Sequence, residues 1–548
     1  MTSRASARLA WLVAIVVAIV AGTSAPAPWP EGPATLRLAR VDGRVVEAPL
    51  TLGDATPLDL KVEGLQVALP DGAPLDHPVE VRVSGGDVAR VSLGLRDGRD
   101  ALLPTVERGP DHVLARRRPV GPAAAVLALL GAVVVLWVTE VLPLWVTALL
   151  VPVALVATGA GAARPALAPF FHPVIALFFG GFLMAEAMKR ARLDHLVAVH
   201  VVGRFGTSPA TLFAAVLGVS AFLSMWMSNT AAVAVLIPIA MAVTGPLQDR
   251  AYRKVLILGL AYAATVGGVG SAVGTPANPI AMDFLGRYAG RLVGFVEWFA
   301  FGLPFVLVFL PVMGAYLWWR GGVQVDPARF AEARALARAE LEAAPGLDRQ
   351  QRTVGAVFLV TVGLWLAQSW HGVHPGIVAI GGAAALAALG QVTTDDLGRI
   401  SWGALLTFGG GLTLGEFVVE SGASDWIATR LEAFAGLSPA LSVALVGALA
   451  LGLTTVASNT ASAAVLIPLA IPLSAVLGVS PALLVLVVAV ASSVDFALVI
   501  GTPPTMMAYS TGLFSAGEIF RKGVVLDLLG LLLLVTAVAW FWQAAGLL

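Results

Sequence analysis

Cysteine is absent from the sequence, and charged residues are scarce. The lack of cysteine excludes a disulfide framework, cysteine-ligated zinc, iron–sulfur clusters and thiol nucleophiles. Only 12% of the 548 residues are charged, against about 25% in soluble globular chains, while 58% are hydrophobic. The formal net charge is zero and no long basic run or acidic tail occurs, so no nucleic acid partner is expected. These values indicate a polytopic membrane protein.

The N-terminal segment, residues 1–25, carries Arg4 and Arg8 before a short apolar run, Leu9 to Ala21. We interpret it as a first transmembrane helix, with a cleaved signal peptide ending near Ala25 as the alternative. Either interpretation places the segment that follows outside the cytoplasm.

Residues 26–118 have the pattern of short β-strands. Apolar and polar residues alternate in several runs, and Asp42-Gly43 is a hairpin turn signal. The strand-like runs lie at 35–41, 58–62, 79–83 and 88–95. We expect a small extracytoplasmic β-rich domain that acts as a spacer or cap, with ligand sensing as the alternative.

One apolar stretch occurs twice. MSNTAAVAVLIPIAMAV, at Met227 to Val243, is nearly repeated by ASNTASAAVLIPLAIPL, at Ala457 to Leu473. Ser458 follows Ser228 by 230 residues, and a second pair of similar blocks, FFGGFLMAE and FGGGLTLGE, has the same offset. A shared offset over separate blocks indicates a duplicated unit.

The apolar runs after residue 118 divide into two such units. We predict transporter repeat 1 at 119–320, a cytoplasmic linker at 321–352 and transporter repeat 2 at 353–548, with about 11 transmembrane helices in all. Two apolar segments, 209–243 and 438–475, are too long for one span and short for two. We predict that each is a re-entrant helical hairpin with Ser-Asn-Thr at its tip.

Lysine and arginine placement gives the orientation. Basic clusters at 189–192, 250–254, 329–352 and 521–522 all fall in the cytoplasm if the β-rich domain is outside and the N-terminus inside. Arg116 to Arg118 are an exception. With five spans and one hairpin each, the two halves start on opposite sides, which predicts inverted-topology repeats, an architecture of secondary transporters. We expect an integral protein of a bacterial inner membrane, in contact with lipid.

Each half also contains a predicted helix interruption. Gly274-Thr275-Pro276 follows Gly267 to Gly270, and Gly501-Thr502-Pro503 occupies the matching place in the second half. Proline lacks a backbone donor and glycine loosens a helix, so carbonyl groups are released there. In lipid, a broken helix is tolerated only where it lines a cavity or binds a ligand.

Pairing each hairpin tip with its broken helix suggests a binding site. Carbonyl, serine and asparagine oxygens suit a small monovalent cation, while hydroxyls, amides and helix N-termini can donate hydrogen bonds to an anion. Two cation clamps would then flank one central space for a dicarboxylate.

Other polar residues of the spans have simpler interpretations. Glu186 and Glu416 occupy matching positions and are expected to form structural ion pairs or mark span ends, with proton coupling as the alternative. Asp495 is a further acid in an apolar segment. His172, before Pro173, is expected at a span boundary rather than on a metal.

The paired SNT triplets, each followed by a run that contains Pro238 or Pro468, and the paired GTP breaks resemble the divalent-anion/sodium symporter family of dicarboxylate carriers. FHPVIALFFGGF, at Phe171 to Phe182, is similar as well, and the resemblance extends over about residues 120–548. It implies a homodimer in which a mobile transport domain moves against a scaffold as an elevator. The β-rich segment is a departure from the family's common core.

The resemblance also implies residues for each role. The first sodium site would use Ser224, Ser228, Asn229 and the backbone near Gly274, and the second Thr454, the Ala457 backbone, Asn459 and the backbone near Gly501. The substrate carboxylates would meet Ser228, Asn229, Thr230, Ser458, Asn459 and Thr460, with Thr275, Thr502 and Pro503 lining the site.

The sequence therefore favours sodium-coupled symport of C4-dicarboxylates such as succinate, malate or fumarate, with sodium as the coupling ion. A sulfate or tricarboxylate carrier and a sodium-independent exchanger are left as alternatives, because all would meet similar neutral donors. An intramembrane enzyme is not expected, since no GxSxG or HExxH motif occurs in the spans.

Overall fold

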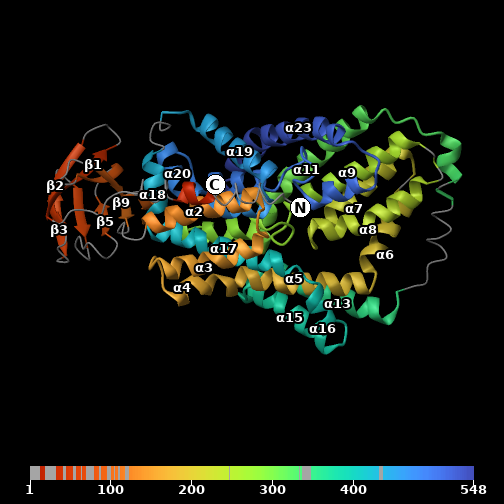
Figure 1. Ribbon diagram of the computed structural model, residues 1–548, viewed down its shortest axis with the longest axis horizontal. Helices are drawn as coiled ribbons and strands as arrows, with labels where there is room; N and C mark the ends of the chain where they lie inside the picture. Colours follow the sequence, from red (N-terminus) through yellow and green to blue (C-terminus); the bar gives the residue numbers. More distant parts are fainter. Residues whose placement is uncertain are drawn as a thin grey trace.

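The computed structural model describes most of the chain. The described residues are 13–18, 32–40, 45–52, 57–62, 65–69, 79–84, 88–94, 100–103, 105–108, 112–117, 123–205, 207–245, 247, 249–332, 334–335, 347–430 and 436–548. Residues 13–18 of the predicted N-terminal helix are helical, and the predicted Asp42-Gly43 turn lies outside the described residues. Two small sheets stand at one end of a large helical body (Figure 1).

The strands pair only in antiparallel fashion within the described part of the chain. They are β1 (Gly32–Arg40), β2 (Val45–Leu52), β3 (Leu58–Val62), β4 (Leu65–Leu69), β5 (Val79–Ser84), β6 (Val88–Gly94), β7 (Asp100–Leu103), β8 (Thr105–Arg108) and β9 (His112–Arg117). One sheet has the order β2-β1-β6-β7 and the other β3-β4-β5-β9-β8. Alternate residues of β1, β2, β4 and β5 form a buried hydrophobic core, as the alternating burial of β4 illustrates.

The described residues of all four strand-like runs fall in strands, namely β1, β3, β5 and β6. The other five strands, β2, β4, β7, β8 and β9, contain none of these runs. The basic residues Arg116 and Arg117 belong to β9, where Arg116 is opposite Glu80 of β5. Their place in a sheet explains why they do not follow the charge pattern of the membrane segments.

The helical body contains two series of helices. The first comprises α2 (Ala123–Thr139), α3 (Leu144–Ala157), α4 (Ala163–Leu167), η1 (Ala168–Phe171), α5 (Pro173–Arg190), α6 (Leu193–Phe205), α7 (Pro209–Ser224), α8 (Asn229–Thr244), α9 (Arg250–Gly268), α10 (Ala277–Tyr288) and α11 (Phe295–Gly321). The second comprises α13 (Arg349–Leu366), α14 (Gln368–His371), α15 (Pro375–Ala388), α16 (Thr394–Arg399), α17 (Trp402–Glu420), α18 (Ala423–Arg430), α19 (Pro439–Val456), α20 (Asn459–Leu477), α21 (Pro481–Ala491), α22 (Pro503–Ser510), α23 (Ala516–Leu533), η3 (Leu534–Val538) and α24 (Ala539–Ala544).

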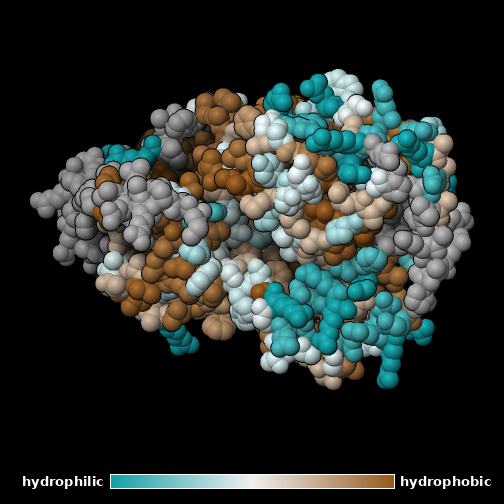
Figure 2. Space-filling view, turned by 45° about the vertical axis from the view of Figure 1, so that its right-hand side comes forward, coloured by the Kyte–Doolittle hydropathy of each residue, from teal (hydrophilic) through white to brown (hydrophobic). Residues whose placement is uncertain are grey.

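Six helices of the described residues are long and apolar enough to cross a membrane, counting continuous runs such as Ala516–Ala544 as one. Six shorter apolar helices of 10–17 residues accompany them. Large hydrophobic side chains such as Leu307, Leu359 and Trp540 are exposed, and hydrophobic residues cover wide areas of the face in Figure 2. Such an apolar exterior suits contact with lipid. The protein is thus a mainly helical, polytopic membrane protein.

The arms of the second hairpin, α19 and α20, are among those six long helices. Their length therefore does not distinguish a re-entrant hairpin from two full spans, contrary to the argument from the 438–475 segment. The arms of the first hairpin, α7 and α8, are shorter, with 16 residues each. The re-entrant arrangement stays a prediction.

Helices of the two series pack in matching pairs. Helix α5 packs on α15, and α17 on α3; α10 packs on α20 and α21, and α22 on α8 and α9. Each contact in the first of these pairs has its counterpart in the second, because α17 follows α5, and α22 follows α10, by about 230 residues. Gly180 of α5 lies against the backbone of Ala379, and Gly410, 230 residues later, against Ala148. The same close approach therefore recurs between the two series.

The two helices that precede the predicted interruptions lie at the centre of the body. In α21 every residue from Ala482 to Ala491 is buried, and α9 is buried from Val255 to Gly268. Because these helices have no face on lipid, the segments that follow them are enclosed by protein.

We predict that Gly180→Ala and Gly410→Ala each destabilise the protein. A Cβ at either glycine would overlap backbone atoms of the facing helix, and overpacking of this kind costs about 1–3 kcal/mol. Thermal unfolding of the purified protein in detergent measures the loss. Gly181→Ala is the control, because a Cβ there meets no atom within 4 Å. Equal stability of all three variants would contradict the proposed close packing.

Candidate functional site

Both Ser-Asn-Thr triplets lie at the turn between two hairpin arms. Ser228 is the N-cap of α8, where its hydroxyl accepts a hydrogen bond from Ala231 N at 3.3 Å. Ser458 caps α20 in the same way, through Ala461 N at 3.2 Å. Each triplet thus opens a helix whose free backbone N–H groups point toward the turn.

The first tip contacts the first interruption. Ser224 Oγ, fully buried, donates to Asn229 Oδ1 at 2.5 Å. The Asn229 amide lies against Gly268, because a Cβ at Gly268 would be 2.7 Å from Asn229 Oδ1 and 3.0 Å from Gly274 O. The structure therefore brings Ser224, Asn229 and Gly274 together, three of the residues predicted for the first cation site.

The second tip has the corresponding contacts. Thr454 Oγ1 lies 2.9 Å from Asn459 Oδ1 and 2.7 Å from the carbonyl of Ser492, and Asn459 Nδ2 donates to the carbonyl of Ser493 at 3.4 Å. Ala457 joins the two arms in extended backbone. Thr454 and Asn459 are thus brought together as predicted.

Gly501 occupies the same place in its interruption as Gly274. Its N–H donates to Leu498 O at 3.2 Å, as that of Gly274 does to Ser271 O at 3.4 Å. It packs against the Asp495 carboxylate, whereas Gly274 packs against the backbone of Gly268. The carbonyls that the second tip engages are instead those of Ser492 and Ser493. The interruption therefore begins at Ser492, where α21 ends, and not at the Gly-Thr-Pro triplet.

The two interruptions meet at the centre of the molecule. Thr275 Oγ1 of the first lies 3.4 Å from Ser493 Oγ of the second, and both residues are buried. The same Ser493 carries the carbonyl that Asn459 contacts. The two polar clusters are therefore connected through side chains of both halves.

The predicted substrate residues differ in exposure. Thr230 and Pro503 are exposed, and Ser228, Asn229, Ser458, Asn459 and Thr460 are half-buried. Thr275 and Thr502 are 2% exposed, and the Thr502 hydroxyl caps α22 through Thr505 N at 3.4 Å. The asparagines and the exposed threonine are thus open to a ligand, while Thr275 and Thr502 serve packing and capping in this conformation.

Asn278 holds the first interruption together, and it was not predicted. Its Nδ2 lies within hydrogen-bond distance of three carbonyl oxygens, those of Gly268, Val269 and Ser271, at 3.0, 3.3 and 2.6 Å. The side chain is fully buried. An asparagine two residues after a Gly-Thr-Pro break was the available signal, but it does not reveal which carbonyls the amide reaches.

Glu186 and Glu416 both form ion pairs, as expected for structural acids. Glu186 Oε1 lies 2.6 Å from Lys189 Nζ, and Glu416 pairs with Arg287 of α10. His172 is the N-cap of α5, consistent with a helix boundary. Within the described residues, no group of three or more His, Cys, Asp or Glu side chains could hold a metal ion.

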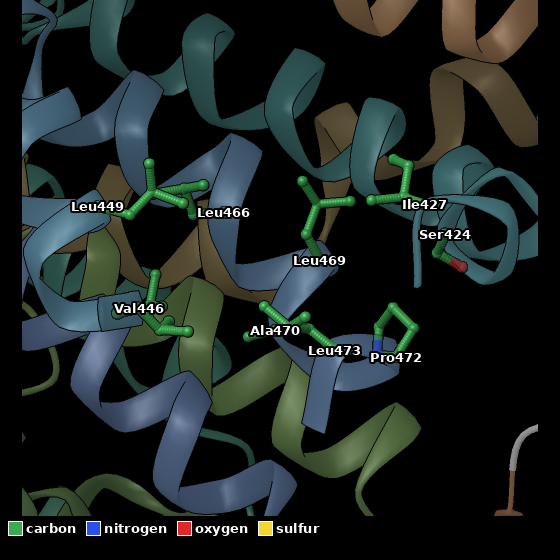
Figure 3. Close-up of a pocket in the computed structure, with 10 residues that line it drawn as sticks. Ser424, Ile427, Val446, Leu449, Leu466, Leu469, Ala470, Pro472 and Leu473 are labelled. Atoms are coloured by element: carbon green, nitrogen blue, oxygen red, sulfur yellow. The ribbon is translucent and has the colours of Figure 1, made fainter. Parts of the chain in front are cut away.

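An apolar cavity of about 70 Å³ lies away from the triplets, between α18, α19 and α20 (Figure 3). Leu449, Leu466 and Leu469 are among its lining residues, and Ser424 supplies its one hydroxyl. It lacks the donors that an anion requires, so the polar clusters at the hairpin tips remain the candidate site.

We predict that Asn278→Ala destabilises the protein by about 1–3 kcal/mol, the usual cost of leaving a buried polar group without its partner. Chemical or thermal unfolding in detergent measures the loss. Ser462→Ala is the matched control, because that buried hydroxyl has no hydrogen-bond partner among the described residues. If both substitutions had the same small effect, the amide would not be what satisfies the released carbonyls.

The chain matches known proteins over this helical region. The family model described as the sodium:sulfate symporter transmembrane region matches residues 121–548. An uncharacterized transporter of Haemophilus influenzae is 33% identical over 470 residues, 82% of this chain and 98% of its own length. The sodium-dependent dicarboxylate transporter SdcS of Staphylococcus saprophyticus is 29% identical over 441 residues, 75% of this chain and 85% of its own.

Among solved structures, the Neisseria gonorrhoeae MtrF efflux pump matches with a TM-score of 0.49 and 14% identity, over 71% of this chain and 84% of that one. A likeness of that size establishes nothing about this site. The family match extends over most of the chain and includes both tips and both interruptions. The chain therefore belongs to the divalent anion:sodium symporter family, a family of membrane transporters and not of enzymes.

Proposed function

We propose that the protein is a sodium-coupled symporter of C4-dicarboxylates such as succinate, malate and fumarate. The observation that carries this proposal is the pair of matched clusters, Ser224–Asn229 and Thr454–Asn459, joined through Thr275 and Ser493. Relatives named sodium-dependent dicarboxylate transporter support the choice of ion and substrate class.

Each cluster would hold one sodium ion. The first site would consist of Ser224, Ser228, Asn229 and the Gly274 backbone, and the second of Thr454, Ala457, Asn459 and the Gly501 backbone. Because Thr454 and Asn459 contact the carbonyls of Ser492 and Ser493, we add these two carbonyls to the proposed ligands of the second sodium ion. Hydroxyl, amide and carbonyl oxygens are hard neutral ligands, which suits a small monovalent cation.

The dicarboxylate would bind between the two tips. Helices α8 and α20 both begin there, and helix N-termini offer N–H donors and positive potential to carboxylates. The proposed contacts are Ser228, Asn229, Thr230, Ser458, Asn459 and Thr460, with Thr275, Thr502 and Pro503 close by. Bound sodium would offset the substrate charge, so we expect sodium to bind first.

The proposed architecture is a pair of inverted-topology repeats with about 11 transmembrane helices, two re-entrant hairpins and two broken helices. The packing between the halves supports this arrangement. Helix α10 of the first half packs on the hairpin arm α20 of the second half, and α22 of the second half packs on the hairpin arm α8 of the first. We further propose a homodimer in the bacterial inner membrane, with the N-terminus inside, that transports by an elevator movement.

A sulfate carrier is the second candidate, because the description of the matching family names sulfate. Sulfate and tricarboxylates would meet the same neutral donors, and a sodium-independent exchanger would use the same central space. Competition during uptake distinguishes these functions. Excess unlabelled sulfate or citrate should leave succinate uptake unchanged if the first proposal holds.

We predict that proteoliposomes take up radiolabelled succinate when a sodium gradient is imposed and that Asn229→Ala with Asn459→Ala abolishes uptake. Each lost hydrogen bond to a charged ligand costs about 1.5–3 kcal/mol, roughly 10- to 100-fold in affinity. Thr353→Ala is the control, since that hydroxyl donates to the Arg349 carbonyl of its own helix. Uptake unaffected by sodium would refute symport, and full activity of the double variant would refute the site.

For the β-rich segment we propose a spacer or cap outside the membrane. We predict that deleting residues 26–118, with both flanking segments retained, leaves the rate of succinate uptake within about twofold of the full chain, since no residue of the proposed site lies there. A large loss at equal amounts of folded protein would favour ligand capture by this segment.

A further inference from the structure

Asp495 is an acid without an ion-pair partner in the described part of the membrane body. It lies in the second interruption and is 0% exposed. Among the described residues neither carboxylate oxygen accepts a hydrogen bond of ordinary geometry, although the backbone N–H of Ala497 is close to it. A carboxylate in such surroundings must be neutralised, because a buried unpaired charge is far costlier than a buried neutral group. Either a bound cation or a proton must therefore neutralise it.

The carboxylate points into the interruption itself. Its oxygens lie over the Cα of Gly501, so that a Cβ at position 501 would overlap them. Gly501 belongs to the backbone proposed for the second sodium site. The loop between Ser492 and Gly501 thus folds back on itself. Thr454 and Asn459 contact its first carbonyls, and the Asp495 carboxylate contacts its last residue, Gly501.

The residues around Asp495 supply no positive charge. Asp527 of α23 is 5% exposed and accepts a hydrogen bond from Phe496 N at 2.9 Å, directly after Asp495. Tyr262 of α9 donates to Phe496 O at 2.9 Å. Neither acid forms an ion pair within the described part of the chain. Two neighbouring buried acids make a bound cation more favourable than one would.

The first interruption is built differently. Gly268 precedes Gly274 by six residues, as Asp495 precedes Gly501, so glycine stands where the second half has the acid. In the first half the Asn278 amide lies on three carbonyls, whereas the matching position in the second half is Thr505. The second interruption therefore has a carboxyl group, that of Asp495, which the first lacks, and it has no amide donor at the position of Asn278.

We propose that Asp495 is an anionic ligand of a sodium ion bound in the second interruption, where it joins carbonyl oxygens of residues 492–501. This inference extends the second sodium site of the proposed function and rests on it. Carboxylate and carbonyl oxygens are hard ligands that suit a small cation. The charge makes the second site the stronger of the two, since the first contains only neutral ligands.

Sodium binding can be measured without any substrate, as the rise in unfolding temperature of the detergent-purified protein when NaCl replaces choline chloride. We expect Asp495→Asn to raise the sodium concentration for half of this effect by about tenfold or more, as expected when a charged ligand is lost. Asp527→Asn is the matched comparison. Its expected change is smaller, below about threefold, because that carboxylate binds the backbone and would act on the ion only through its charge.

The outcomes separate this inference from the proposed function. If Asp495→Asn keeps the sodium midpoint while the unaltered protein takes up succinate with sodium, the inference is wrong and the transport proposal stands. If Asp495→Asn loses sodium affinity but the unaltered protein takes up no dicarboxylate, the substrate proposal is wrong and the inference stands.

A second measurement uses the unaltered chain, so it does not depend on the folding of a variant. Dicyclohexylcarbodiimide modifies buried carboxyl groups, and mass spectrometry of the peptide that contains Asp495 quantifies the product. We expect saturating sodium, but not choline, to reduce labelling of Asp495 at least about fivefold, since an occupied carboxylate is not available to the reagent. Labelling that is insensitive to sodium would mean that a proton neutralises the acid, and would overturn the proposal.

Discussion

Backbone groups inside a bilayer have no water to bind, so each N–H and C=O released where a helix is interrupted needs a partner within the protein. This constraint organises the helical body. The helices before the two interruptions, α9 and α21, are buried in its centre. The second hairpin tip lies on the carbonyls that follow α21, and Asn278 lies on those that follow α9. The groups that satisfy the released backbone are the same ones that make a polar site.

The two halves satisfy the constraint by different means. In the first, the Asn278 amide and the Asn229 side chain approach the broken segment as neutral groups. In the second, Thr454 and Asn459 hold the carbonyls of Ser492 and Ser493, while Asp495 introduces an acid without an ion-pair partner among the described residues. A duplicated sequence thus produces two related clusters of different composition, which is the physical basis on which we propose two cation sites of unequal strength.

Much of this arrangement could be predicted from local sequence. The Ser-Asn-Thr triplets cap helices because short polar side chains accept from free N–H groups, and Gly-Thr-Pro breaks a helix because of its backbone chemistry. The repeat offset located the counterparts of each element. The start of the second interruption at Ser492 could not be predicted, because no glycine or proline marks it. The arms of the second hairpin, unlike those of the first, are long enough to cross a membrane, which the spacing argument did not foresee.

The sequence by itself determined the membrane class, the duplication, the hairpin tips and the residue types of the site, because composition and periodicity report local preference. Only the tertiary structure decided that α10 packs on α20 and α22 on α8, that Thr275 meets Ser493, and which carbonyls Asn278 and Asn459 reach. These contacts join segments far apart in the chain, and no local pattern encodes their distance. The pair of triplets therefore indicated a candidate site, and packing between the two halves brought its residues together.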